Sequence, residues 1–191
     1  MRKTTLGPLL IAATLLAGCL PAEDPVLYTV PGAATDRRVS VPQQTISVRE
    51  VSLPTYAANE EISVLVAGGQ IAEDGNNLWA DDPVRAVTLR LTRAIGDLTR
   101  RTVAADPWPY RAPPEVTVDV RIEEFVAEIS GAFVARGQFY IAHEDTELLS
   151  RSVTFDLSVP FDPAGGFSAI AAARSQVIAA LAMEVAQKGL R

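Results

Sequence analysis

Four of the pairs of adjacent acidic residues in this 191-residue sequence are the first positions that suggest catalysis: Glu60-Glu61, Asp81-Asp82, Glu123-Glu124 and Glu144-Asp145. Two carboxyl groups can act as general acid and general base when they face one substrate and their surroundings separate their pKa values. Each pair here falls in an expected turn, helix cap or strand edge, and neighbours along a strand point to opposite faces of the sheet. The pairs therefore do not predict a catalytic site.

The single histidine and the single cysteine exclude several other kinds of site. A Ser-His-Asp triad would have to use His143, but no serine stands in a Gly-x-Ser-x-Gly turn. One Cys and one His are too few for a structural zinc site or an internal disulfide framework. The glycine pairs 68–69 and 165–166 lack the spacing of a phosphate-binding loop. We therefore expect no catalytic, metal-binding or cofactor-binding residues, and a protein that is not an enzyme.

The charge balance excludes a nucleic-acid-binding role. The chain has 17 Lys and Arg against 23 Asp and Glu, which gives a net charge of −6 and a pI near 4.8. Contacts to phosphates need a clustered basic surface, and no such run of residues occurs.

The N-terminus carries a pattern for membrane attachment. Arg2 and Lys3 precede a short apolar stretch at positions 6–16, which is too short to span a bilayer, and small residues follow. The quartet Leu16-Ala17-Gly18-Cys19 resembles the lipobox of bacterial lipoproteins. That resemblance implies cleavage of a signal peptide at 1–18, diacylglycerol on the Cys19 sulfur and a third acyl chain on its amine. A free or buried cysteine after an ordinary signal peptide is the alternative.

The remaining chain divides into a spacer and one domain. Removal of 1–18 leaves a net charge of −8, and proline recurs through 19–44, so this segment is expected to be a tether. Within it, 26–30 is expected to dock as a short edge strand. The domain is expected to cover 45–191, since strand and helix periodicity begin only there.

The periodicity of 45–191 predicts strands and two helices in a defined order. Strands are expected at 46–53, 62–66, 116–122, 133–141 and 153–159, with a bulge near Phe125. One amphipathic helix follows Asp81-Asp82-Pro83 and includes apolar positions up to Val103; a second covers 167–188 and stops at Gly189. This order predicts an α/β fold: one mixed sheet, with a right-handed parallel crossover and an antiparallel meander, covered by the two helices.

Three aromatic residues are candidate partner contacts: Tyr56, Trp79 and Trp108. Tyr56 and Trp108 are expected in proline-bounded loops, where a rigid aromatic side chain makes a good binding anchor. The alternative for Trp79 is that it packs the first helix onto the sheet. The arginines at 90, 93, 100 and 101 are expected to form a salt-bridged solvent face around Asp97, with a patch for lipid headgroups or an acidic partner as the alternative.

The chain resembles the auxiliary lipoprotein component of ABC-type transport systems, the family typified by the paraquat-inducible protein C lipoprotein. The resemblance rests on the order of its motifs: Cys19, the segment Leu27-Tyr28-Thr29-Val30, the Pro54-Thr55-Tyr56 element, and Trp79 opening the first helix. The meander and the Ala-rich last helix also agree. Ala57-Ala58-Asn59 departs from the Leu-Asp-Arg common in the family, and Gly137-Gln138-Phe139 from a common tryptophan.

This resemblance implies a docking subunit on the periplasmic face of the outer membrane, where Leu20 after the lipidated cysteine agrees with that location. The implied partner is an MCE-domain protein that spans the periplasm and belongs to an ABC-type system for lipid transport. Whether the chain forms a homo-oligomer is left open. The alternative is an envelope assembly lipoprotein that pilots an outer-membrane pore, and an envelope hydrolase is a more distant one.

Overall fold

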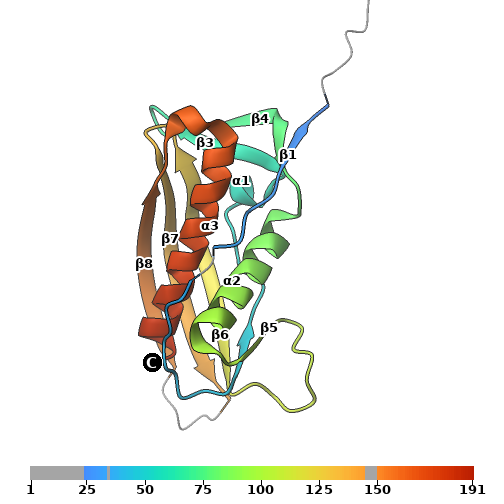
Figure 1. Cartoon of the computed structure of the whole chain (residues 1–191), viewed down its shortest axis with the longest axis vertical. Coiled ribbons are helices and arrows are strands. Elements are labelled where there is room, and N and C mark those ends of the chain that lie inside the picture. Colours follow the sequence, from blue (N-terminus) through green and yellow to red (C-terminus); the bar gives the residue numbers. More distant parts are fainter. Residues whose placement is uncertain (1–23, 34, 145–149) are drawn as a thin grey trace, which may run out of the picture.

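Eight strands, three α-helices and two short helical turns make up the part of the chain that the computed structural model describes, residues 24–33, 35–144 and 150–191 (Figure 1). The expected signal peptide at 1–18, Cys19 and Leu20 lie outside these residues. In chain order the elements are β1 (Val26–Tyr28), β2 (Thr45–Val48), α1 (Thr55–Ala58), β3 (Glu61–Val66), β4 (Gln70–Trp79), α2 (Pro83–Thr99), β5 (Thr102–Ala105), β6 (Val116–Glu128), β7 (Ala132–His143), β8 (Arg151–Pro160), a 3₁₀ turn (Pro163–Gly165), α3 (Gly166–Glu184) and a π-helical turn (Val185–Gly189).

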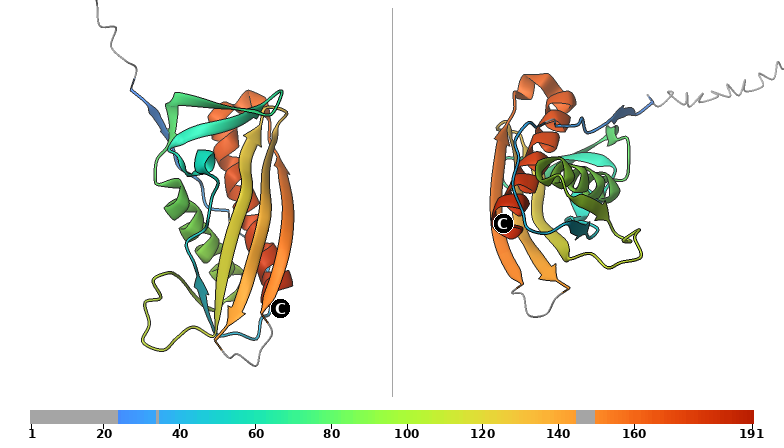
Figure 2. Two further views of the ribbon diagram at one scale, coloured as in Figure 1. Left: turned by 180° about the vertical axis from the view of Figure 1, so that it is seen from behind. Right: turned by 60° about the horizontal axis from the view of Figure 1, so that its bottom comes forward.

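Strand β6 organises the sheet, because it pairs along both of its edges. On one edge lie β7 and then β8, all antiparallel, which confirms the expected meander. On the other edge, β2 pairs in parallel with the start of β6, where Ile46 lies beside Val116, and β3 pairs in parallel with its end, where Val64 lies beside Ala127. Beyond β2 lies β5, and beyond β3 lie β4 and β1. The sheet is therefore mixed, as expected, and forked along this edge (Figure 2).

The predicted bulge lies in the middle of β6. The register with β7 shifts between Ile122 and Glu124, two positions before Phe125. Gly137 lies opposite, and a Cβ atom there would come within 2.2 Å of the Arg121 carbonyl oxygen. The bulge therefore requires a residue without a side chain on the neighbouring strand.

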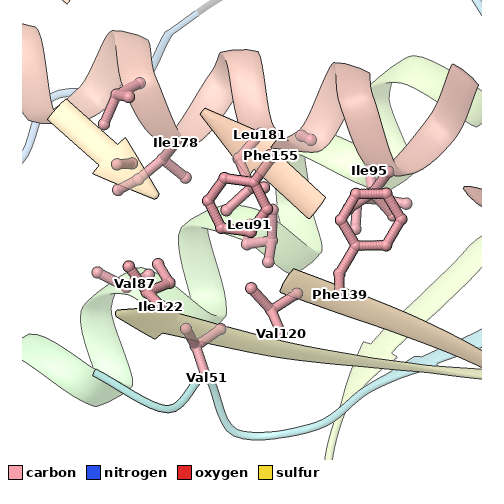
Figure 3. Packing of buried hydrophobic residues seen from close by; sticks show 14 of the residues in the cluster. Val51, Val87, Leu91, Ile95, Val120, Ile122, Phe139, Phe155, Ile178 and Leu181 are labelled. Carbon is pink, nitrogen blue, oxygen red and sulfur yellow. The ribbon is translucent and has the colours of Figure 1, made fainter. Parts of the chain in front are cut away.

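Helices α2 and α3 pack against each other on one face of the sheet, where the hydrophobic core forms (Figures 1 and 2). Figure 3 shows Leu91 and Ile95 of α2 and Leu181 of α3 pointing toward Val120 and Phe139 of the sheet. All five are buried. This arrangement confirms the expected α/β layering, because each helix buries an apolar stripe against the same apolar sheet face.

The opposite face of the sheet is polar and carries ion pairs. Arg136 of β7 pairs with Glu124 of β6 at 2.5 Å and with Asp156 of β8 at 3.0 Å. Asp119 of β6 pairs with Arg121 at 3.0 Å. Such charged neighbours, across strands for Arg136 and along β6 for Asp119, fit a solvated face.

Helix α3 is apolar enough to resemble a membrane span. The stretch Pro163–Gly189 has the length and composition of a membrane-spanning helix, with a mean hydropathy of 1.4. However, 61% of its most apolar 18 residues are buried in the fold. It lies between α2 and strands β7 and β8. Its surroundings are those of a core helix.

The structure confirms the expected start of the first helix and shows a strand directly before it. Gln70–Trp79 forms strand β4, which was not expected because its charged and polar residues show no apolar alternation. Trp79 therefore ends a strand rather than opening a helix. Helix α2 begins at Pro83, with the Asp82 carboxylate accepting a hydrogen bond from the Arg85 N–H at 2.7 Å.

The expected end of that helix is also corrected. Helix α2 ends at Thr99, and Arg100 adopts a left-handed conformation with φ of 58°. Val103 therefore belongs to β5, a strand not expected from the sequence, rather than to the apolar face of the helix. Strand β5 lies parallel to β2, and α2 lies in the connection between them.

Much of the expected tether is packed on the domain. The edge strand is confirmed, because β1 pairs in parallel with β4 at the sheet edge. After it, however, Val39 and Val41 are buried. The Val39 N–H donates to the Leu98 carbonyl at 3.0 Å, and Arg101 donates to the Val41 carbonyl at 2.7 Å. The described part of 24–44 is therefore not a free spacer.

The last helical segment ends at the expected glycine, but its final turn is π-helical. Helix α3 runs to Glu184 and continues as the π-helical turn that includes Gly189. A Cβ atom at Gly189 would lie 2.8 Å from the Phe139 ring, so the glycine permits close packing on β7. Lys188 pairs with Glu184 at 2.6 Å.

Candidate functional site

The structure brings two of the three candidate aromatic residues together and separates the third. Tyr56 and Trp79 line the same interior region with Phe125 and Arg174. Trp108 lies in the loop between β5 and β6, at the end of the molecule opposite β1 (Figure 1). The three residues therefore do not form one surface.

Trp79 belongs to the interior. Its side chain is only 7% exposed, and the guanidinium carbon of Arg174 lies 4.0 Å from the centre of its ring. This is a cation–π contact in a desolvated setting. The placement agrees with the alternative in which Trp79 packs helix against sheet, although the helix is α3.

Tyr56 lies in the short helix α1 rather than in a loop. Its hydroxyl accepts a hydrogen bond from the Phe125 N–H at 3.2 Å, next to the β6 bulge. Burial raises the pKa of Tyr56, while the hydrogen bond from Phe125 lowers it and the nearby Glu124 raises it. Tyr56 therefore helps to hold α1 against the sheet and is only partly accessible.

Arg174 is the residue on which this region converges. It lies in the middle of α3 and is 2% exposed, and its guanidinium also lies 5.2 Å from the ring of Phe125. Within the described residues its Nε and Nη2 atoms are buried without a hydrogen-bond partner. Burial lowers the pKa of Arg174 to about 9, so the side chain is cationic at neutral pH.

A hollow of about 210 Å³ opens beside Arg174, between β1, the end of β4 and helices α2 and α3. We call it the Arg174 hollow. Its walls combine apolar and aromatic side chains with two arginines; among them are Tyr28, Val30, Trp79, Ala86, Leu89, Arg90 and Arg174. Asp81 also lines it, but its carboxylate is held by Arg85 at 2.5 Å. The hollow is therefore apolar with a positive charge at its wall.

The loop that carries Trp108 is held in shape from within. The Trp108 indole N–H donates to the Ala112 carbonyl at 2.7 Å, and the Tyr110 ring packs edge-on at 5.0 Å between centres. Ser47 anchors the start of the loop by donating to Asp106 at 2.5 Å. Tyr110 is 56% exposed. Trp108 thus acts as an internal brace, and Tyr110 is the aromatic side chain presented to solvent.

The other candidate groups take structural positions. Asp97 forms no ion pair with Arg93 or Arg101 within the described ranges, which corrects the expected salt-bridged face; Arg101 instead donates to Val41 and Gln44. Asp82 caps α2, and Glu124 pairs with Arg136. No group of three or more potential metal ligands occurs among the described residues.

Arg174 and Tyr110 were not among the residues predicted from the sequence. Arg174 had a visible signal, since it lies four residues after Ile170 and three before Val177, on the predicted apolar face of the helix. A charged residue at such a position is buried together with the apolar side chains of the same helix face. Tyr110 lies two residues after Trp108 in the same proline-rich loop.

Comparison with known proteins identifies the family of this chain. The model of a family described as the ABC-type transport auxiliary lipoprotein component matches residues 27–186. No curated protein matches the chain. A crystal structure of an uncharacterized protein is similar with a TM-score of 0.70 and 19% identity, over 87% of this chain and 99% of that one. Protein XCC0632 from Xanthomonas campestris, of the DUF330 family, is similar with a TM-score of 0.62 and 16% identity, over 86% and 96%. At these identities the solved structures support the fold alone.

Proposed function

Because this chain belongs to the family of ABC-type transport auxiliary lipoprotein components, we propose that it is a non-catalytic docking subunit of an MCE-type system for lipid transport. In this proposal it is anchored to the outer membrane through acyl chains on Cys19 and binds an MCE-domain protein that spans the periplasm. The observation that carries the proposal is the family match, which extends over nearly all of the folded body rather than over one motif.

The packing of the N-terminal segment limits how far the domain can stand from the membrane. Residue 24 is the first that the structure describes, and it is five residues after Cys19. Five residues span at most about 18 Å when fully extended. A lipid anchor on Cys19 would therefore keep the β1 end of the domain near the bilayer, which a free spacer of 26 residues (19–44) would not do.

The opposite end is then the one that faces the periplasm. It carries the loop of Trp108 and Tyr110 (Figure 1). A hollow of about 450 Å³ lies at the same end, lined by Pro42, Pro114, His143 and neighbouring residues. An exposed tyrosine on a braced loop loses little conformational entropy on binding, which is typical of an interface anchor. We propose this loop, rather than Tyr56 or Trp79, as the docking surface.

The first test is co-purification of the lipidated protein with its membrane partners. The proposal expects an MCE-domain protein in the eluate. Recovery of a secretin or β-barrel instead would support the assembly-lipoprotein alternative and refute the MCE role.

The second test is a titration of the domain without its lipid against the purified partner. Tyr110→Ala should weaken binding more than tenfold, which corresponds to about 1.4 kcal/mol. Ile129→Ala is the matched control, because Ile129 is also exposed (62%) but lies at the far end of β6. Equal affinity of the Tyr110 variant and the parent would exclude the loop as the docking surface.

A further inference from the structure

Arg174 is a buried cation without a counter-ion in the described structure. Its Nε and Nη2 atoms are enclosed and make no hydrogen bond, and no carboxylate of the described residues lies within ion-pair distance of it. Buried polar groups in folded proteins are nearly always hydrogen-bonded, and the exceptions need a physical explanation. The rings of Trp79 and Phe125 beside Arg174 offer the cation their π faces but no hydrogen-bond acceptor, so Nε and Nη2 stay unsatisfied.

The third nitrogen gives this cation access to a ligand. Nη1 is not among the enclosed unsatisfied atoms, and Arg174 lines the Arg174 hollow. Arg90 of α2 also lines this space of about 210 Å³, so a second arginine lies at its wall. The acidic residue of the wall, Asp81, is already paired with Arg85. The hollow therefore presents positive charge that the described chain does not neutralise.

The remaining walls of the hollow favour a ligand that carries an apolar chain next to its charged group. Tyr28, Val30 and Ala86 line the hollow, and Leu89 at its wall is 44% exposed. Val26 lies two residues before Tyr28 on the same side of β1 and is 52% exposed, so apolar surface continues outward. The volume is smaller than a typical drug-sized pocket and suits a head group with a few methylenes rather than a whole lipid.

We propose that the Arg174 hollow binds a carboxylate carried on an apolar chain. The carboxylate accepts hydrogen bonds from Arg174 and Arg90, and the chain leaves over Leu89. This site is separate from the Trp108 loop, so the failure of either assignment leaves the other standing.

The test uses the mature chain, residues 19–191, with Cys19→Ser so that no attached acyl chain competes. Adding Trp108→Phe leaves Trp79, in the hollow wall, as the only tryptophan. Titration with octanoate should then change the tryptophan fluorescence in a saturable way. Octanol, which lacks the charge, and acetate, which lacks the chain, should each bind at least tenfold more weakly.

Arg174→Met should weaken octanoate binding by tenfold to a hundredfold, because it removes hydrogen bonds from a charged donor. Arg93→Met is the matched control, since Arg93 is an exposed arginine of α2 that does not line this hollow. If Arg174→Met does not fold, Leu89→Glu provides a second variant: it adds a negative charge at an exposed position of the wall and should abolish binding without loss of structure.

Three results would overturn the proposal. A fluorescence change that does not saturate with octanoate excludes a specific site. Equal octanoate affinity of the Arg174 variant and the parent excludes recognition by Arg174. Octanol that binds as tightly as octanoate shows a merely apolar pocket. Loss of partner binding by Arg174→Met without any octanoate binding would show that the hollow receives an acidic side chain of a protein instead.

Discussion

Replacing Arg174 with methionine should stabilise the folded domain at pH 7. Burial lowers the pKa of Arg174 to about 9, and since each tenfold change in protonation corresponds to about 1.4 kcal/mol, the cost of burying this charge is on the order of 5 kcal/mol. The cation–π contacts to Trp79 and Phe125 offset about 2 kcal/mol or more of this burial cost. Methionine has a similar volume and packs well on aromatic rings. We therefore expect a net gain of about 1 to 3 kcal/mol.

The pH dependence has a definite sign. Below pH 9 the arginine is protonated in both the folded and the unfolded chain, so the burial cost is fully present and the difference between the proteins should be constant. Above pH 9 the folded parent begins to lose this proton, so the cost decreases and the advantage of Arg174→Met should shrink as the pH rises toward 12.

Urea denaturation followed by circular dichroism at pH 7 and pH 8 measures this difference, and a thermal melt should show a rise of roughly 5 °C. Arg93→Met serves as the control, because Arg93 is exposed and its replacement should change the free energy of unfolding by less than about 0.5 kcal/mol. A loss of more than about 2 kcal/mol for Arg174→Met would refute the reasoning, since it would mean that the buried guanidinium is neutralised and contributes to stability.

Three further predictions concern packing and the anchor. Gly137→Ala should destabilise the domain by about 2 kcal/mol or more, because the new Cβ would lie 2.2 Å from a carbonyl oxygen, whereas Gly75→Ala, with nothing within 4 Å, should be nearly neutral in the same denaturation experiment. Val41→Ala should lower the free energy of unfolding by about 1 to 2 kcal/mol, since Val41 is buried; an unchanged midpoint would restore the spacer interpretation of this segment. Cys19→Ser should abolish labelling with palmitate in cells, and undiminished label would exclude lipidation at Cys19.

The elements that could be predicted from the sequence are those in which apolar residues alternate at strand spacing or recur at helix spacing. The inward valines of β6, including Val116, Val118 and Val120, alternate with polar residues, so both the strand and its bulge could be located. Helices α2 and α3 were recognised from their apolar stripes. The mixed sheet followed from the order of these elements, and the family resemblance was confirmed.

The elements that were missed lack such a pattern. Strand β4 carries exposed charged residues, because it lies near the edge of the sheet and little of it is covered. Strand β5 has only four residues and directly follows a helix of similar apolar spacing, so Val103 was assigned to the wrong element. The packing of Val39 and Val41 depends on contacts with residues near 98–101, which local periodicity does not report.

The candidate site was predictable only in part. Trp79 and Tyr56 were selected for their residue type, but their shared environment depends on Arg174, more than ninety positions further along the chain. Proline density indicated a stiff loop at Trp108, yet it did not show which aromatic side chain braces the loop and which one is exposed. Side-chain direction within a loop is set by hydrogen bonds that spacing does not reveal.

The fork of the sheet along β6 divides the molecule into two parts that should differ in local stability. The lobe of β3, β4 and β1 is joined to β6 through only two paired positions, Val64 with Ala127 and Leu65 with Glu128, whereas β6 and β7 pair along almost their whole length. A lobe with so few backbone pairs to β6 should open locally at a lower free energy than the meander. Its amide protons should therefore exchange with deuterium together, and earlier than those of the meander. Trp79 belongs to this lobe and Arg174 to the body, so each opening event separates the cation from its ring and exposes both to water.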